Sequence, residues 1–216
     1  MSRSEQRIPK LRSRGRANRE KLLRCAEQML ADNNGRAWRF SDVFEAAGVS
    51  RGSAYRIYNG IDDLMHDLAA DWVQNFVQHL ATVRPEQPPE TWMQLTDFII
   101  KSGAEYWAMT KNRLRAMPRV RSNAPASYKA AVKDLSDCLA RLYDRYFHVP
   151  DIPDWHDKLA FATQLVDFAY SDAVRKEGAI NGDRLREAQT LAKTYFGFYL
   201  PPSVPPRERP RARSLA

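Results

Sequence analysis

Apolar side chains recur three or four residues apart along most of this chain, which is the spacing of one face of an α-helix. The repeat is most regular in two C-terminal segments, where it falls on Leu159, Ala162, Val166, Ala169 and Ala173 and then on Leu185, Ala188, Ala192, Tyr195 and Tyr199. No stretch shows the alternating pattern of a β-strand, and no glycine-rich phosphate loop occurs. The sequence therefore predicts an all-α protein.

The predicted helices form two groups separated by Pro85, Pro88 and Pro89. The apolar spacing predicts long helices over residues 17–32, 60–83, 89–108, 125–147, 154–177 and 182–199, with a short helical piece near 108–117. Pro201 and Pro202 should end the folded part, because proline cannot continue a helix.

Between the first two long helices, residues 41–58 have the pattern of two short helices joined by a tight turn. Gly48 accommodates a positive φ that ends the first helix, and Ser50 is a good N-cap for the second. Side chains able to reach phosphates or base edges follow: Arg51, Ser53, Tyr55 and Arg56. This pattern is typical of a helix-turn-helix that reads double-stranded DNA.

The net charge of +8 is concentrated at the two ends of the chain. Residues 1–24 sum to +7 and residues 201–216 to +3, which leaves −2 for the rest. A basic segment beside a helix-turn-helix favours neutralisation of DNA phosphates. Residues 1–16 lack periodicity, so we expect a flexible basic arm that contacts the DNA backbone through Arg12, Arg14 and Arg16, and a disordered basic tail over residues 201–216.

Residues 17 to 70, about a quarter of the chain, resemble the TetR family of bacterial transcriptional regulators. The resemblance rests on Glu45-Ala-Ala-Gly-Val-Ser-Arg-Gly-Ser-Ala-Tyr55, on Tyr58 and on the Asp62-Asp63-Leu64 segment that follows. It implies a three-helix DNA-binding domain over residues 17–62 and a helical ligand-binding and dimerisation domain over residues 63–200. By position, it also implies DNA contacts from Arg39, Ser50, Arg51, Gly52, Ser53, Tyr55, Arg56 and Tyr58.

Three positions depart from the family's pattern. Ile61 stands where members carry a phosphate-binding lysine, Ala54 replaces a leucine, and Phe44 replaces a small residue. The basic arm can compensate for the lysine by entering the minor groove. The departures also leave open another class of protein, a helical interaction protein whose helix-turn-helix is vestigial.

The second predicted domain is rich in aromatic and methionine side chains, which favours an apolar pocket for a small-molecule effector. The candidates are Trp92, Tyr106, Trp107, Met117, Tyr128, Tyr143 and Phe168. A helical bundle also needs such residues in its core. Arg113, Arg115, Arg119 and Arg121 either attract an acidic ligand or form a solvated face.

The two regular C-terminal helices are predicted to pair with a second copy of the chain, since close apolar seams suit coiled-coil-like packing. The interface candidates are Ala162, Val166, Ala169, Ala173, Ala188, Ala192, Tyr195 and Tyr199. The resulting expectation is a homodimeric repressor that binds a palindromic DNA operator and is released by a small ligand. Control by a protein partner in place of a ligand is the alternative.

Other classes of protein are disfavoured. No nucleophile, base, cofactor cradle or set of metal ligands has a recognisable arrangement, so the sequence predicts no enzyme activity, no cofactor and no metal site. Two scattered cysteines, Cys25 and Cys138, suggest a reducing compartment. No apolar run reaches the length of a membrane span, and no signal peptide is apparent, so a cytoplasmic protein is expected.

Overall fold

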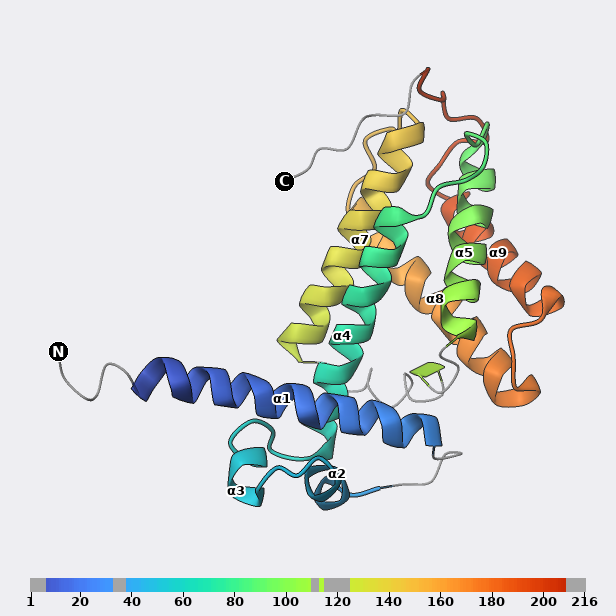
Figure 1. Cartoon of the computed structure of the whole chain (residues 1–216). Helices are drawn as coiled ribbons and strands as arrows, with labels where there is room; N and C mark the ends of the chain where they lie inside the picture. The colour runs from blue at the N-terminus through green and yellow to red at the C-terminus, as the bar shows by residue number, and fades with distance from the viewer. Residues whose placement is uncertain (1–6, 33–37, 110–112, 115–124, 209–216) are drawn as a thin grey trace. The chain divides into compact units, whose positions relative to one another are not determined.

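The computed structural model describes residues 7–32, 38–109, 113–114 and 125–208. These residues confirm the all-α prediction: they contain no β-strand, and the one isolated bridge pairs Phe147 with Pro206. The helices of Figure 1 are α1 Arg7–Asp32, α2 Phe40–Ala46, α3 Arg51–Ala54, α4 Ile61–Thr82, α5 Trp92–Ala108, α7 Ala126–Tyr146, α8 Trp155–Glu177 and α9 Gly182–Phe196. The short helical piece predicted near 108–117 lies mostly outside the described residues.

The chain divides into two compact units, which we call unit 1 (Met1–Ala69) and unit 2 (Ala70–Ala216). The division falls inside α4, whereas the sequence places it between residues 62 and 63. Leu64 and Leu68 are buried, and Asp67 is bonded to α1. The first turns of α4 therefore belong to unit 1, and the rest of the helix belongs to unit 2.

Helix α1 begins ten residues earlier than the sequence pattern indicates. The expected arm, residues 1–16, is helical from Arg7 onward, and residues 1–6 lie outside the described part. This corrects the prediction of an irregular segment. The early start is physically reasonable because straight-chain Arg, Lys and Leu favour helix, and Pro9 lies in the first turn, where its missing N–H is tolerated. The sequence signal failed here because this stretch has no apolar period.

Unit 1 is held together by Asp67 on α4. The Arg19 side chain of α1 donates two hydrogen bonds to its carboxylate, from Nε to Oδ2 and from Nη2 to Oδ1, each at 2.7 Å. The Tyr58 hydroxyl, just beyond α3, donates to Oδ2 at 2.5 Å. Such a two-pronged, partly buried ion pair fixes direction as well as distance. One carboxylate thereby joins α1, the segment after α3 and the start of α4.

Unit 2 is a bundle in which α8 packs against α7 and α9, and α9 packs against α5. Helix α4 lies beside α7 (Figure 1), where the Gln74 amide donates to Asp134 at 2.6 Å. Helix α5 begins at a capping box in which Thr91 accepts from the Gln94 N–H. Gly178, with φ of 77°, ends α8 in the left-handed conformation that glycine adopts without strain.

The segment Pro201–Glu208 is not the disordered tail predicted from its prolines. The Trp92 indole N–H donates to the Pro201 carbonyl at 2.9 Å, and Val204 is buried. Arg207 donates through Nη2 to the Asp144 carboxylate and through Nε to the Asp144 carbonyl, both at 2.6 Å. Backbone bonds and an ion pair thus hold residues 201–208 against unit 2, and residues 209–216 lie outside the described part.

Replacement of Asp67 by Asn should destabilise the protein because it removes the charge that the Arg19 and Tyr58 hydrogen bonds depend on. We expect the free energy of unfolding to fall by about 2 kcal/mol, the usual value for charge-assisted hydrogen bonds. Glu45→Gln removes the same charge from an exposed position of α2 and should change stability by less than about 0.5 kcal/mol. Urea unfolding of the two variants checks this, and equal losses would contradict it.

Two truncated chains should show how much residues 201–208 and residues 209–216 each contribute to the stability of the protein. A chain that ends at Glu208 keeps every contact described above and should unfold like the full chain. A chain that ends at Leu200 loses the Arg207 ion pair, the Trp92 partner and the burial of Val204. We expect it to be less stable by roughly 3 kcal/mol. Thermal unfolding measures both chains, and an unchanged midpoint for the shorter chain would show that the segment contributes nothing.

Candidate functional site

The turn between α2 and α3 has the geometry that the sequence predicts. Gly48 has a φ of 64°, and the buried Val49 returns its N–H to the Phe44 carbonyl at 2.9 Å. Ser50 occupies the N-cap position of α3, although its hydroxyl bonds to the Ser53 hydroxyl at 3.0 Å and not to a backbone N–H. Helix α3 ends at Ala54, which makes it shorter than the predicted recognition helix of residues 50–58.

A cluster of aromatic rings fixes α3 against α2. The Phe40 ring lies 5.6 Å from Phe44, 5.2 Å from Tyr55 and 6.4 Å from Tyr58, all edge to face. Such contacts stabilise beyond simple burial and define ring orientation. Ala54 is also fully buried, so the large Phe44 and the small Ala54 that depart from the family's pattern both lie within the core of unit 1. The core is filled differently, and the layout of α2 and α3 is kept.

The outer side of α3 presents the predicted polar residues to solvent. Arg51, Gly52 and Arg56 are exposed, and Tyr55 keeps 47% of its surface exposed although its ring packs on Phe40. The Arg51 guanidinium lies 5.7 Å from the centroid of the Tyr55 ring. The Arg56 Nε donates to the Gly52 carbonyl at 3.0 Å. This surface offers two guanidinium groups and a tyrosine on a short, well-anchored helix.

Tyr58 lies apart from that exposed surface, and its predicted DNA contact stays a prediction. It is only 5% exposed, and its hydroxyl is committed to Asp67. Its position at the end of the recognition segment was the only sequence signal, and that signal cannot tell an anchor from a contact. Arg39 is exposed at the start of α2, where its backbone N–H donates to Asp42 Oδ2 at 2.7 Å.

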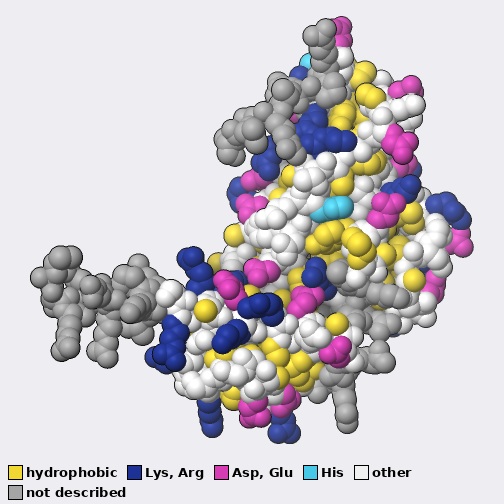
Figure 2. Space-filling model, viewed as in Figure 1, with side chains coloured by type: hydrophobic (Ala, Val, Ile, Leu, Met, Phe, Trp, Pro, Cys, Tyr) yellow, Lys and Arg dark blue, Asp and Glu magenta, His cyan; other side chains and the backbone are white. Residues whose placement is uncertain are grey.

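Basic side chains also stand along α1. Arg14 and Arg16 are exposed, and Figure 2 shows Lys and Arg side chains projecting from the surface of unit 1, with acidic ones between them. Arg12 is helical, and its side chain lies outside the described part. The predicted backbone contacts of the arm would therefore come from a helix in place of a flexible strand of chain.

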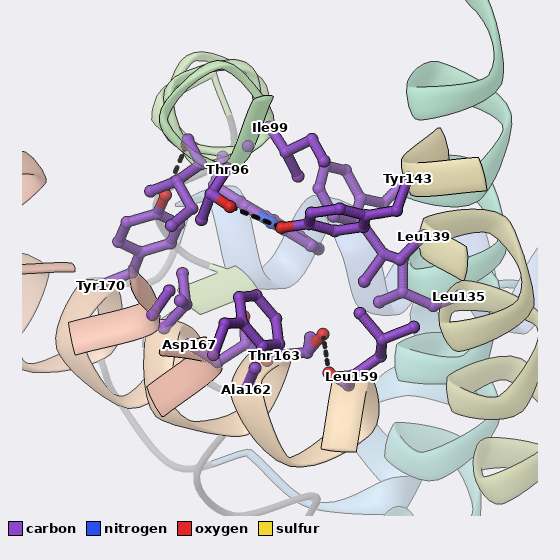
Figure 3. A pocket seen from close by; sticks show the side chains of 17 residues that line it. Thr96, Ile99, Leu135, Leu139, Tyr143, Leu159, Ala162, Thr163, Asp167 and Tyr170 are labelled. Atoms are coloured by element: carbon purple, nitrogen blue, oxygen red, sulfur yellow. Dashed lines mark hydrogen bonds between the residues drawn. The ribbon is translucent and has the colours of Figure 1, made fainter. Parts of the chain in front are cut away.

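Unit 2 contains an apolar cavity between α4, α5, α7, α8 and α9 (Figure 3). Its volume is about 70 Å³, and the space between its walls, including the part open to solvent, is about 550 Å³. The lining residues are Phe76, Thr96, Ile99, Ile100, Gly103, Trp107, Leu135, Leu139, Tyr143, Leu159, Ala162, Thr163, Val166, Asp167, Tyr170, Ala192 and Phe196. Polar atoms are few, which is the usual composition of a small-molecule site.

Two of the predicted pocket residues, Trp107 and Tyr143, line this cavity, and the others described do not. Trp92 and Tyr128 are buried elsewhere, Tyr106 lies 4.9 Å from the His79 ring, and Phe168 is 69% exposed. Met117 lies outside the described residues. Aromatic content alone could not find the remaining walls, because threonine, glycine and small apolar residues give no such signal.

The hydroxyl groups of the cavity are bonded within the protein. Tyr143 and Thr96 lie 2.6 Å apart, oxygen to oxygen, and the Tyr170 hydroxyl donates to the Ile100 carbonyl at 2.6 Å. Burial raises the pKa of Tyr143, and the same cause, reinforced by Asp167, raises that of Tyr170. Both phenols therefore keep their hydrogens at neutral pH.

Glycine at position 103 allows the ring of Phe76 to reach α5. A Cβ at Gly103 would lie 3.3 Å from Phe76 Cζ and 3.7 Å from Tyr170 Oη. Phe76 is on α4, so this cavity wall belongs to the helix whose first turns form part of unit 1.

The alanine seams of α8 and α9 face inward. Ala162, Ala173, Ala188 and Ala192 are buried within the protomer, at most 4% exposed, where α8 packs on α9, and the partly exposed Val166 lines the cavity. The four alanines leave almost no surface for a second chain, and the role of the seam in a dimer interface stays a prediction. Small side chains at helical spacing indicate a close helix pair, and they do not tell whether the partner helix is in the same chain.

Large apolar side chains on the outer surfaces of α8 and α9 are exposed instead. Phe161 and Phe168 are 48% and 69% exposed on α8, and Leu191 is 38% exposed on α9. Beyond the end of α9, Phe198 is 80% and Tyr199 is 37% exposed. The half-buried Tyr195 lies 5.2 Å from the Phe161 ring and 5.3 Å from the Tyr199 ring, which joins the two helices in one apolar surface.

None of the described helices combines the length and the apolar character needed to cross a membrane. In the part of the chain that the structure describes, no group of three or more His, Cys, Asp or Glu residues is placed to hold a metal ion.

No family model matches the sequence, and no curated protein sequence is similar to it. Solved structures are similar. A TetR-family transcriptional regulator from Streptomyces coelicolor is 17% identical over 85% of this chain and 99% of its own, with a TM-score of 0.62. A TetR transcriptional regulator from Rhodococcus sp. RHA1 is 12% identical over 83% and 96%, with a TM-score of 0.65.

Two further similar structures contain a small molecule. SmeT in complex with triclosan is 16% identical over 92% of this chain and 100% of its own, and RolR in complex with resorcinol is 15% identical over 87% and 89%. Both have a TM-score of 0.51. The proteins from Streptomyces coelicolor and Rhodococcus are described as transcriptional regulators and not as enzymes. The chain therefore has the fold of the TetR-family transcriptional regulators, as the resemblance of its helix-turn-helix implies.

Proposed function

We propose that this protein is a TetR-like transcriptional repressor that binds a palindromic DNA operator as a homodimer and is released by a small molecule. The observation that carries the proposal is the exposed side of α3. Arg51 on α3, and Tyr55 and Arg56 directly after it, are accessible there on a segment that the Phe40 cluster anchors. Two exposed guanidinium groups and a phenol on a short helix and the turn after it suit the phosphates and base edges of a major groove.

The charges of α1 support DNA as the partner. Exposed Arg14 and Arg16 lie on the helix that Asp67 ties to the segment after α3. Because a cationic side chain near a phosphate releases bound counterions, the affinity for DNA should fall steeply with salt. The helical arm in this way supplies part of the backbone binding that Ile61 does not provide.

A second copy of the chain is the proposed occupant of the exposed apolar surface on α8 and α9. Phe161, Leu165 and Phe168 follow one another at positions i, i+4 and i+7 on α8, so they lie on one face. Residues 191 and 195 share a face of α9 in the same way. Association of these faces in two copies would form a four-helix interface and would bring two recognition helices together, as a palindromic operator requires.

The cavity is the proposed effector site. Its volume of about 70 Å³ is smaller than the cavity of about 150 Å³ that holds benzene in another protein. A ligand with a ring is therefore expected to displace side chains or to extend into the part open to solvent, and Phe76 on α4 rests against Gly103. A ligand that binds best when Phe76 has moved would shift α4 between conformers and thereby alter DNA affinity. SmeT and RolR, which share the fold, have been solved with triclosan and resorcinol.

The DNA-binding proposal predicts that Arg51→Ala and Tyr55→Ala each weaken operator binding by roughly 10- to 100-fold, as expected for the loss of contacts of about 1–3 kcal/mol. The operator would first be selected from genomic fragments with the wild-type protein, and affinities measured by fluorescence anisotropy. Arg186→Ala removes the same charge from an exposed position of α9 and should bind normally. Equal binding by all variants would show that the charged surface binds DNA generically, and that the helix-turn-helix is vestigial.

The dimer proposal predicts that Phe168→Glu produces a monomer, because a charge would then be buried in the interface. Sedimentation equilibrium measures the mass. Met109→Glu is the matched control, since Met109 is also a large exposed apolar residue, at 75%, but lies outside α8 and α9. It should leave the dimer intact. A dimeric Phe168→Glu variant would rule out this surface as the interface.

A further inference from the structure

We propose that the cavity of unit 2 selects an apolar ligand that donates a hydrogen bond and rejects anions. This inference rests on the proposed role of the cavity as an effector site and adds the chemical class of the ligand. It follows from the hydrogen bonds that the hydroxyl groups of the cavity walls already donate to the protein. The wall hydroxyls described below use their hydrogens on protein acceptors, which leaves mainly oxygen lone pairs for a ligand.

The direction of the bond between Thr96 and Tyr143 can be assigned. The Thr96 hydroxyl donates to the Trp92 carbonyl at 2.8 Å. A hydroxyl has one hydrogen, so the 2.6 Å contact with Tyr143 requires Tyr143 to be the donor. The Tyr143 hydroxyl thus has no hydrogen left for a ligand, and its oxygen can still accept one (Figure 3).

The other two hydroxyl groups of the walls likewise have no hydrogen left for a ligand. Tyr170 donates to the Ile100 carbonyl at 2.6 Å, and Thr163 donates to the Leu159 carbonyl at 3.0 Å. Figure 3 shows these bonds as dashed lines on opposite sides of the cavity. The helix carbonyls that accept them are fixed by the backbone, so the hydroxyls cannot turn toward a ligand without losing a buried hydrogen bond.

The charged side chains of the cavity walls also disfavour an anionic ligand. Asp167 is the only lining residue with an acidic or basic side chain among the described residues, and a carboxyl group adds further acceptor oxygens. Arg113 does not line the cavity, since its guanidinium lies 5.6 Å from the Trp72 ring centroid. Arg115, Arg119 and Arg121 lie outside the described residues. A carboxylate ligand would thus meet oxygen atoms, hydrocarbon and at most the Trp107 indole N–H, without a cation to replace its water.

These constraints define the ligand class. Its body is hydrocarbon, which suits Leu135, Leu139, Leu159 and the aromatic walls, and it carries a hydroxyl or N–H group that can donate to Tyr143. Phenol is the smallest probe of this kind. Anisole has the same ring and oxygen without the hydrogen, and benzoate has the same ring with a negative charge.

Binding of phenol, anisole and benzoate to the full-length protein tests the ligand class by calorimetry or ligand-detected NMR. We expect phenol to bind at least roughly 10-fold more tightly than either of the others, because a buried acceptor that loses its donor costs about 1–3 kcal/mol. Equal or tighter binding of anisole or benzoate would overturn the inference. So would the absence of binding by all three up to their solubility limits.

A substitution at Thr96 should change the preference. Thr96→Val keeps the shape of the side chain, removes the acceptor of the Tyr143 hydrogen and leaves that hydrogen to a ligand. We expect the preference for phenol over anisole to fall by at least about fivefold, since the ether oxygen of anisole gains a donor. Thr163→Val is the matched control, because it frees no phenolic hydrogen, and it should keep the preference for phenol. An unchanged preference in Thr96→Val would contradict the assigned direction of the bond.

A second variant covers the case in which Thr96→Val does not fold. Tyr143→Phe removes an acceptor and should weaken phenol binding while that of anisole stays the same. If the affinity for phenol is unchanged, Tyr143 is not an acceptor for the ligand and the inference fails.

Release of DNA is measured separately with the selected operator, so the two proposals can fail independently. Preference for phenol without release of DNA would support the ligand class and contradict regulation through this cavity. Preference for benzoate with release of DNA would do the reverse.

Discussion

The carboxylate of Asp67 is the interaction on which the geometry of unit 1 depends. It accepts from Arg19 and from Tyr58 at the same time, so it sets α1, the end of the α3 segment and α4 against one another. Packing of small aliphatic residues alone leaves short helices free to slide, whereas charge-assisted bonds to one carboxylate fix direction. Helix α3 has only four residues, and it could not hold its exposed arginines in place without such neighbours.

The fold could be predicted from the sequence because its signals are local. Gly48, the Ser50 N-cap position and the helical spacing of apolar residues each depend on a few neighbours, and the structure confirms the helices they predict. Tyr58 shows the limit of such local signals. Its exposure depends on Asp67, nine positions away on another helix, and residue type alone fits either an anchor or a DNA contact. The start of α1 was missed for a related reason, since residues 7–16 have no apolar period.

The contact surfaces of unit 2 could not be predicted because they depend on which face of each helix is already covered by another helix of the same chain. The alanine repeat on α8 and α9 predicts close packing correctly, and the structure satisfies it within one protomer. The exposed surface is displaced by about one position along each helix, on Phe161, Phe168 and Leu191. The cavity likewise has walls such as Thr96 and Gly103, which become recognisable only once α5 lies beside α7, α8 and α9.

The two units also differ in when they can be completed during synthesis. Arg19, Tyr58 and Asp67 all lie in the first 69 residues, so unit 1 has its central interaction early. Unit 2 cannot complete its contacts early, because Trp92 bonds to Pro201 and Asp144 bonds to Arg207. These partners leave the ribosome after all the described helices, and domains fold as units once their sequence is available. Unit 1 can therefore be structured on a nascent chain while unit 2 still lacks the residues that close it.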